Sequence, residues 1–156
     1  MHLGVLTRAD NKGTDVVVEL AERGVAGWQL AFAGVGAPSP AGAISHNRFL
    51  AAGELVAVVE ASTSTLLPYR FASQSGVIVL AQALGSVPIA TRVGGLPEQI
   101  EDGVTGLLLP QGAGADELAE ALRRLDGPEA TAMAAKGQAT AWDRHADFAR
   151  AVRGLL

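Results

Sequence analysis

The chain has 156 residues, a net charge of −4 at pH 7 and 49% hydrophobic residues, which is enough apolar material for one domain with a sizeable core. Charged residues make up only 18%, which excludes disorder and argues against an electrostatic nucleic-acid binder. The lack of cysteine excludes disulfides and thiolate metal sites, and neither a signal peptide nor an apolar run of about 18 residues is evident. We therefore expect a single cytoplasmic domain over residues 1–156, with no transmembrane segment.

Short apolar stretches alternate with helical patterns through the first half of the chain. Thr14 or Asp15 is expected to cap the first helix, and Gly24 to end it. The predicted strands are residues 3–6, 28–33, 44–49 and 65–67, and the predicted helices are residues 14–23 and 54–61.

The second half contains one ambiguous segment, because the run VIVL at residues 77–80 is β-branched. A helix ending at Leu84 is preferred, since Gly85 and a new strand at residues 87–91 follow at once. Leu118, Leu122 and Leu125 share one helical face. The remaining predictions are a strand at residues 107–109, and helices at 116–125, from Pro128 onward and at 146–155, so that the segment from about 128 to 156 is helical.

This order of elements predicts an α/β fold, a Rossmann-like doubly wound parallel sheet with helices on both faces. Ligands of such sheets bind beyond the carboxyl ends of the strands. The functional edge is therefore expected at three loops, residues 7–13, 70–76 and 92–97.

The loop that precedes the predicted helix at residue 76 is a candidate anion site. Ser73 or Ser75 is suited to cap this helix, and Gly76 allows a ligand close to the backbone. Free amides at the positive helix end favour a diphosphate, although a plainly capped helix explains the same residues. Lys12, with Arg8 four residues earlier, is placed to neutralise a leaving phosphate, although exposed loop cations are common.

The other sequence patterns are weaker signals of function. Gly94 and Gly95 form a turn before Pro97, and Glu98 is expected to open a short helix. The phosphate-loop, dinucleotide and nucleophile-elbow motifs are absent. The three His residues form no metal motif, and the two Trp residues are expected to be core or interface anchors; they are His2, His46, His145, Trp28 and Trp142.

Taken together, these segments resemble one half of a known enzyme family. The stretch LPYRFASQSGVIVLAQALGSVPIATRVGGLPEQIEDGVTGLLLP, residues 67–110, resembles the donor-domain signature of glycosyltransferase family 4 (group 1), in its SQSG subtype. The flanking segments LGVLTRADNKGTDVVVELA and GWQLAFAGVG resemble the family's opening strands. The resemblance implies the C-terminal, nucleotide-sugar-binding lobe of a two-lobed GT-B enzyme, which retains the anomeric configuration and needs no metal or cofactor.

The resemblance also implies which residues bind the donor, a nucleoside diphosphate sugar. No catalytic residue is assigned, because the acceptor-binding lobe lies outside this chain. The implied diphosphate-binding residues are Arg8, Lys12, Ser75, Gly76 and Val77, and the implied sugar- and nucleotide-binding residues are Ser73, Gln74, Gly95 and Glu98.

The chain departs from the family pattern at three positions. Val5 stands after Gly4 where the family has Arg. The family's pair of Glu residues falls at Ala72 and Leu80, while Gln82 would point about 200° away from Leu80 on a helix. These departures affect sugar and ribose recognition more than phosphate binding, and they fit a subfamily with different donor contacts equally well.

Two interpretations follow. The first is a half-enzyme that transfers no sugar in isolation and needs an acceptor-binding lobe or partner chain, with self-association through the inter-lobe face also expected. The second is a non-catalytic nucleotide-sugar-binding or scaffold module; a GT-B sugar epimerase fits the SQSG and GGLPE segments less well.

Overall fold

The computed structural model describes residues 2–3 and 10–153, and their strands are all parallel in two three-stranded sheets. The sheet orders are β1-β2-β3 and β4-β5-β6. Because β1 lies beside β4, the strands follow one another in the order 3-2-1-4-5-6 of a Rossmann fold. The strands are β1 (His2–Leu3), β2 (Ala31–Ala33), β3 (Ile44–His46), β4 (Ser64–Leu67), β5 (Val87–Thr91) and β6 (Leu107–Leu109).

Helices cover both faces of these strands. Successive residues of β4, Leu66 and Leu67, are both buried but belong to different hydrophobic clusters, and Ile89 and Ala90 of β5 divide in the same way. This alternation means that β4 and β5 are packed on both faces, so the predicted doubly wound α/β fold is confirmed. The helices are α1 (Thr14–Arg23), α2 (Ala52–Glu60), α3 (Gly76–Ala83), α4 (Leu96–Gln99), α5 (Ala115–Arg124) and α6 (Pro128–Arg153), with a 3₁₀ turn η1 (Asp10–Lys12) before α1.

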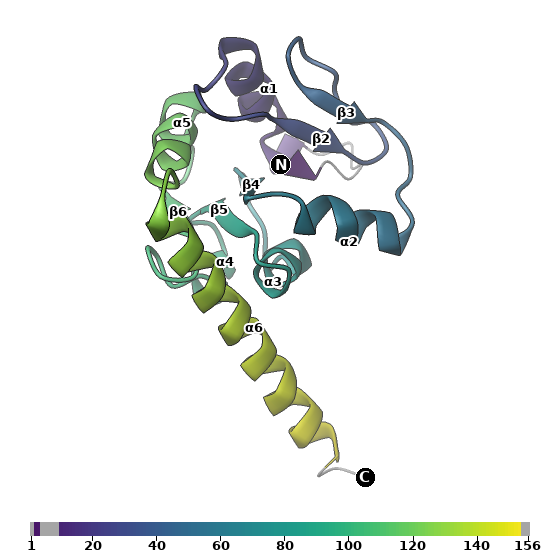
Figure 1. The fold of residues 1–156 in the computed structure, drawn as a ribbon, viewed down its shortest axis with the longest axis vertical. Coiled ribbons are helices and arrows are strands. Elements are labelled where there is room, and N and C mark those ends of the chain that lie inside the picture. Colours follow the sequence, from purple (N-terminus) through teal and green to yellow (C-terminus); the bar gives the residue numbers. More distant parts are fainter. Residues whose placement is uncertain (1, 4–9, 154–156) are drawn as a thin grey trace.

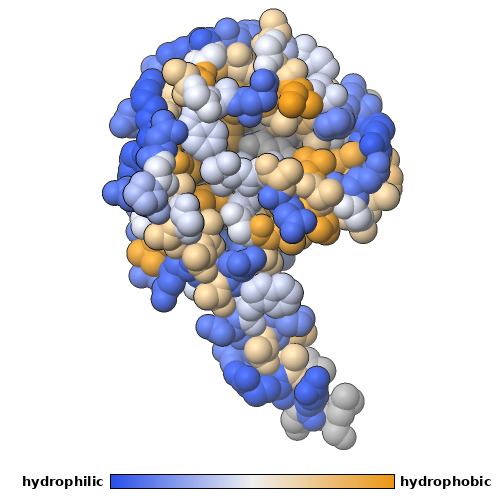
Figure 2. Space-filling view, in the orientation of Figure 1, coloured by the Kyte–Doolittle hydropathy of each residue, from blue (hydrophilic) through white to orange (hydrophobic). Residues whose placement is uncertain are grey.

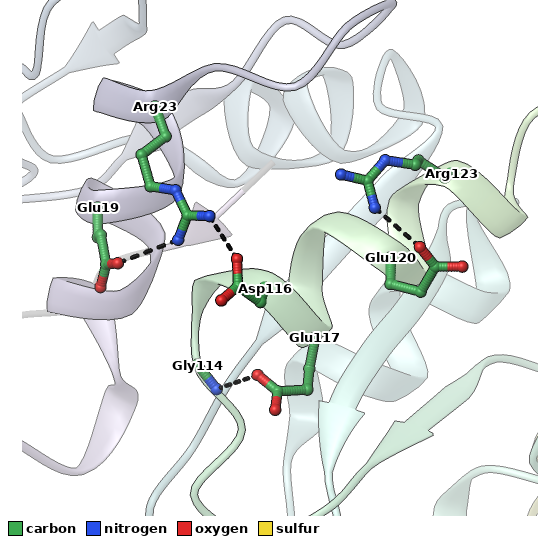
Figure 3. Close-up of polar contacts among 7 residues, drawn as sticks. All are labelled: Glu19, Arg23, Gly114, Asp116, Glu117, Glu120 and Arg123. Carbon is green, nitrogen blue, oxygen red and sulfur yellow. Dashed lines mark hydrogen bonds and ion pairs between the residues drawn. The ribbon is translucent and has the colours of Figure 1, made fainter.

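The amphipathic helix α5 packs beside α1, as Figure 3 shows. Arg23 of α1 donates to Glu19 at 3.2 Å and also to Asp116 of α5. The predicted apolar face of α5 is confirmed, because its leucines are buried, while hydrophilic side chains cover its outer side in Figure 2. Glu117 accepts a hydrogen bond from the Gly114 amide at 2.9 Å and so caps the start of α5.

The C-terminal segment forms one helix, α6, so the prediction of two helices, from Pro128 and over residues 146–155, was wrong. No residue between these two segments interrupts the helix, and Gly137 in its middle packs closely on the loop before β6, where a Cβ would lie 3.3 Å from the Thr105 carbonyl oxygen. The first part of α6 packs against α3 and β5, and the remainder extends away from the body in Figure 1. None of the described helices combines the length and the apolar character needed to cross a membrane.

Several predicted boundaries also differ. The residue that precedes α1 is Gly13 in the left-handed region at φ 62°, so neither Thr14 nor Asp15 caps this helix. The second strand begins at Ala31 because Trp28 closes a turn by donating its amide to Val25 at 3.0 Å. The third strand ends at His46, and residues 4–6 of the first lie outside the described part. The run VIVL is helical within α3, and Gly24 ends α1, as predicted.

Candidate functional site

Three loops meet at the carboxyl edge of the sheet, and glycines allow them to pack backbone against backbone. A Cβ on Gly13 would lie 2.0 Å from the carbonyl oxygen of Pro68, which links the loops after β1 and β4. A Cβ on Gly94 would lie 1.8 Å from the carbonyl oxygen of Ala72, so the loops after β4 and β5 are equally close. The amide of Gly95 donates to the Ser73 carbonyl at 3.1 Å. The structure therefore brings together the loops that the sequence predicts at one edge.

Lys12 is held over the loop that follows β4. Its Nζ lies 3.9 Å from the ring centroid of Tyr69, whose side chain is buried. An ammonium group over a phenol ring is attracted by the partial negative charge that the ring quadrupole places on its face. The same two loops are joined where Arg70 donates its amide to the Asn11 carbonyl at 2.7 Å and its guanidinium to Asp15 at 2.5 Å. The ring of Tyr69 thus holds the Lys12 ammonium group at the carboxyl edge, where Arg70 is paired with Asp15.

The N-terminus of α3 is open to solvent. Ser75 occupies the N-cap position, but its side chain makes no capping hydrogen bond, so the predicted capping by Ser73 or Ser75 was wrong. Among the described residues, no group accepts a hydrogen bond from the amides of Gly76 and Val77, which open the first turn of α3. A Cβ on Gly76 would meet nothing within 4 Å. This end of α3 can therefore receive an anion through its amides and its partial positive charge.

Sequence reasoning missed Gln99, the last residue of α4. Its Oε1 accepts a hydrogen bond from the Ser75 amide at 2.8 Å, and its Nε2 donates to the Ser75 carbonyl at 3.1 Å. The Ser75 amide, predicted as part of the diphosphate site, is therefore already paired. The only signal in the sequence was the position of Gln99 directly after the GGLPE segment.

The other predicted site residues lie on the same three loops. Ser73, Gln74 and Glu98 are exposed, and Gly95 is half-buried. The predicted short helix begins at Leu96 rather than at Glu98. Arg8 lies outside the described residues.

Ala72 and Leu80 stand where the resemblance places the family's pair of Glu residues, and both are half-buried. Gln82 is buried and turned inward, because its Nε2 donates to the carbonyl oxygens of Gln99 at 3.1 Å and Thr105 at 3.3 Å. Within the described part of the chain, no group of three Asp, Glu, His or Cys side chains is arranged to hold a metal ion.

An exposed ion pair orders the loop after β3. Arg48 donates to both carboxylate oxygens of Glu54, at 2.9 and 2.7 Å, and the Ala51 amide donates to Glu54 at 2.9 Å. The hydrogen bond from Arg48 and then that from the Ala51 amide lower the pKa of Glu54 to about 2. This loop is therefore pinned to the first turn of α2.

A hollow of about 410 Å³ lies at the opposite edge of the sheet. Trp28, Ile44, Val58 and Ser64 are among the residues that line it, near the amino ends of β2, β3 and β4. His46, for which the sequence predicts no functional role, lies at its wall, and the lining residues that the structure describes include neither a predicted site residue nor any Asp, Glu, Lys or Arg. The carboxyl edge, with its helix N-terminus and its ammonium group, remains the better candidate for an anionic ligand.

Comparison with known families shows which family the chain belongs to. The model of the family described as glycosyl transferases group 1 matches residues 1–126. The chain belongs to the glycosyltransferase group 1 family. The resemblance predicted from residues 67–110 is thus confirmed for the family, while the SQSG subtype stays a prediction.

Curated relatives of this group 1 chain are much longer than it. Glycogen synthase 1 of Bradyrhizobium diazoefficiens is 31% identical over 163 residues, which cover 92% of this chain and 35% of the relative. A D-inositol 3-phosphate glycosyltransferase of Actinosynnema mirum is 36% identical over 104 residues, which cover 67% of this chain and 25% of the relative. The group 1 chain therefore matches only a minor part of each of these relatives.

Solved structures show the same fold as one lobe of GT-B glycosyltransferases. Anabaena HepE in complex with UDP-glucose aligns with a TM-score of 0.78 at 20% identity, covering 92% of this chain and 44% of HepE. The C-terminal domain of LpcC, a group 1 family protein from Francisella tularensis, aligns with a TM-score of 0.75 at 18% identity and is covered to 85%. The group 1 chain therefore has the size and fold of a single lobe.

Proposed function

We propose that this chain is the donor-binding lobe of a retaining glycosyltransferase and that it binds a nucleoside diphosphate sugar. The observation that carries the proposal is the open N-terminus of α3 at the carboxyl edge, where the amides of Gly76 and Val77 have no partner among the described residues. The solved complexes of HepE with UDP-glucose and with UDP support a ligand of this class.

In this proposal the chain acts on the charge of the leaving group. As the bond between the anomeric carbon and the phosphate oxygen breaks, negative charge grows on the diphosphate. The amides of Gly76 and Val77 donate to its oxygens, and Lys12 opposes the same charge, so no metal is required. Arg8 is proposed to assist Lys12.

The remaining contacts to the donor fall on the exposed loops at the same edge. Ser73 and Gln74 are proposed to hydrogen-bond the sugar or the nucleotide, together with Gly95 and Glu98. Because Ala72 and Leu80 supply no carboxylate, recognition of the sugar and ribose hydroxyls depends on these neutral groups and on Glu98.

The proposed partner is an acceptor-binding lobe that covers the carboxyl edge. Phe49 and Phe71, in the loops after β3 and β4, are 79% and 64% exposed. Trp142 and Phe148, in the C-terminal half of α6, are 57% and 68% exposed. Large exposed aromatic side chains are typical of surfaces that another chain or lobe covers, and a second copy of this chain is the alternative occupant. Sugar transfer is therefore expected only when the acceptor-binding lobe is present.

A non-catalytic nucleotide-sugar-binding or scaffold module is the second candidate. The observation that favours it is the replacement of both family Glu positions by Ala72 and Leu80. The two candidates differ in whether the anion site at α3 binds a donor tightly and through Lys12.

Calorimetric titration with UDP-, GDP- and ADP-sugars tests the proposal. Lys12→Ala is expected to weaken binding about tenfold or more, because it removes a charge-assisted contact to phosphate worth about 1.5–3 kcal/mol. Lys136→Ala, which removes the same charge from the exposed surface of α6, is expected to leave binding unchanged. The absence of binding to every donor in the wild-type chain would favour the scaffold, and equal losses in the two variants would contradict a specific role for Lys12.

A further inference from the structure

The N-cap of α3 is held by a side chain from a distant part of the sequence. Gln99 of α4 lies 24 residues beyond Ser75 and pairs with both of its backbone groups, accepting from the amide at 2.8 Å and donating to the carbonyl at 3.1 Å. The Ser75 hydroxyl makes no cap bond of its own. A primary carboxamide is well suited to this two-point contact, because it offers an acceptor and a donor side by side.

Gln99 is itself fixed from the interior. Its backbone carbonyl accepts a hydrogen bond from the buried side chain of Gln82 at 3.1 Å, and Gln82 also donates to the Thr105 carbonyl at 3.3 Å. The side chain of Gln82, on α3, therefore links the end of α4 and the loop before β6 to α3. The carboxamide of Gln99 consequently stands on a backbone that is anchored independently of Ser75.

We propose that Gln99 is a positioning residue for the diphosphate of the donor. By fixing Ser75, it holds the first turn of α3 so that the amides of Gly76 and Val77 stay directed toward the open end of the helix. The Gln99 side chain is suited to this role because it is uncharged. A carboxylate at this position would accept the same hydrogen bond from the Ser75 amide but would repel the phosphates. This inference rests on the proposed function.

Two variants separate geometry from charge. Gln99→Met keeps the approximate length of the side chain and removes both hydrogen bonds, and it is expected to weaken UDP binding about fivefold. Gln99→Glu adds a negative charge near the anion site and is expected to weaken binding about tenfold, with most of that loss removed in 0.5 M NaCl. Neither variant is expected to change the affinity for uridine, which carries no phosphate.

Gln138→Glu is the matched control. Gln138 of α6 donates to the Ala83 carbonyl at 3.1 Å, at the opposite end of α3, so the same new charge lies one helix length from the anion site. The variant is expected to bind UDP like the wild-type chain. The titrations use UDP, GDP and ADP, each beside its nucleoside, and a loss that is equal for nucleotide and nucleoside would overturn the positioning role.

Amide hydrogen exchange without ligand gives a second readout. The Ser75 amide is expected to exchange slowly in the wild-type chain and about tenfold faster in Gln99→Met, because its acceptor is lost. Unchanged exchange in this variant overturns the inference. A wild-type chain that binds none of the three diphosphates defeats the proposed function, and the positioning role with it. Unaltered diphosphate affinity in both Gln99 variants, beside a wild-type chain that binds, defeats the positioning role alone.

Discussion

Gly94→Ala is the most direct probe of the packing between the loops after β4 and β5. Gly94 has φ of 49°, in the left-handed region, and an added Cβ would lie 1.8 Å from the Ala72 carbonyl oxygen. The obstacle is backbone rather than a flexible side chain. One of the two loops must therefore move to admit a single methyl group.

The expected loss of stability has two parts. Placing alanine in the left-handed region costs about 1–2 kcal/mol. Forcing a methyl group into a filled space costs about a further 1–3 kcal/mol, so Gly94→Ala is expected to lower the free energy of unfolding by about 2–5 kcal/mol. Gly103→Ala is the matched control, because Gly103 has φ of 77° and a Cβ there would meet nothing within 4 Å. This control is expected to lose only the first part, about 1–2 kcal/mol.

Urea denaturation of the three proteins measures both free energies, and thermal melting checks them, at about 2–4 °C per kcal/mol for a chain of this size. Equal destabilisation of the two variants would refute the argument, since the contact with Ala72 distinguishes Gly94 from Gly103. The same displacement moves Ala72 and its neighbours at the candidate donor site, so weaker UDP binding is expected only in Gly94→Ala.

Two further outcomes are expected. The pKa of Glu54 is about 2, below the ordinary value of 4.5, so its pair with Arg48 stabilises the fold fully above about pH 4.5 and loses this effect as the pH falls toward 2. The difference in melting temperature between wild type and Glu54→Gln is therefore expected to shrink from pH 6 to pH 2; a constant difference would contradict the pairing. Tyr69→Leu is expected to weaken UDP binding about three- to tenfold by releasing Lys12, while Tyr69→Phe keeps the ring and the affinity. In a Lys12→Ala background Tyr69→Leu is expected to have no further effect, and a full additional loss in calorimetry would show that the ring acts independently of the ammonium group.

The parts of the fold that sequence reasoning predicted best carry strong local signals. The strand at Val87–Thr91 has both predicted boundaries, because a glycine stop precedes it and a charged turn follows. The strand at Leu107–Leu109 is likewise as predicted. The leucines of α5 are buried as predicted, because their spacing places them on the one face of the helix that packs against the core.

The parts that escaped prediction depend on residues distant in sequence. The continuity of α6 past residue 146 was not predicted, and Gly137 in the middle of this helix packs against the loop before β6. Similarly, Ser75 is a good local candidate for an N-cap, yet the bond is made by Gln99 from another loop. Local propensity indicates that a helix starts there, but it does not indicate which side chain satisfies its first amides.

The C-terminal half of α6 exposes a tryptophan whose fluorescence can report on contacts of this helix. Trp142 is more than half exposed, with its ring edge-on to that of His145 at a centroid separation of 6.1 Å, whereas Trp28 is partly buried against the core. The two indoles therefore report separate events through their emission. The emission maximum of Trp142 is expected to move to shorter wavelength when another surface covers the helix. That of Trp28 is expected to move to longer wavelength when the domain unfolds.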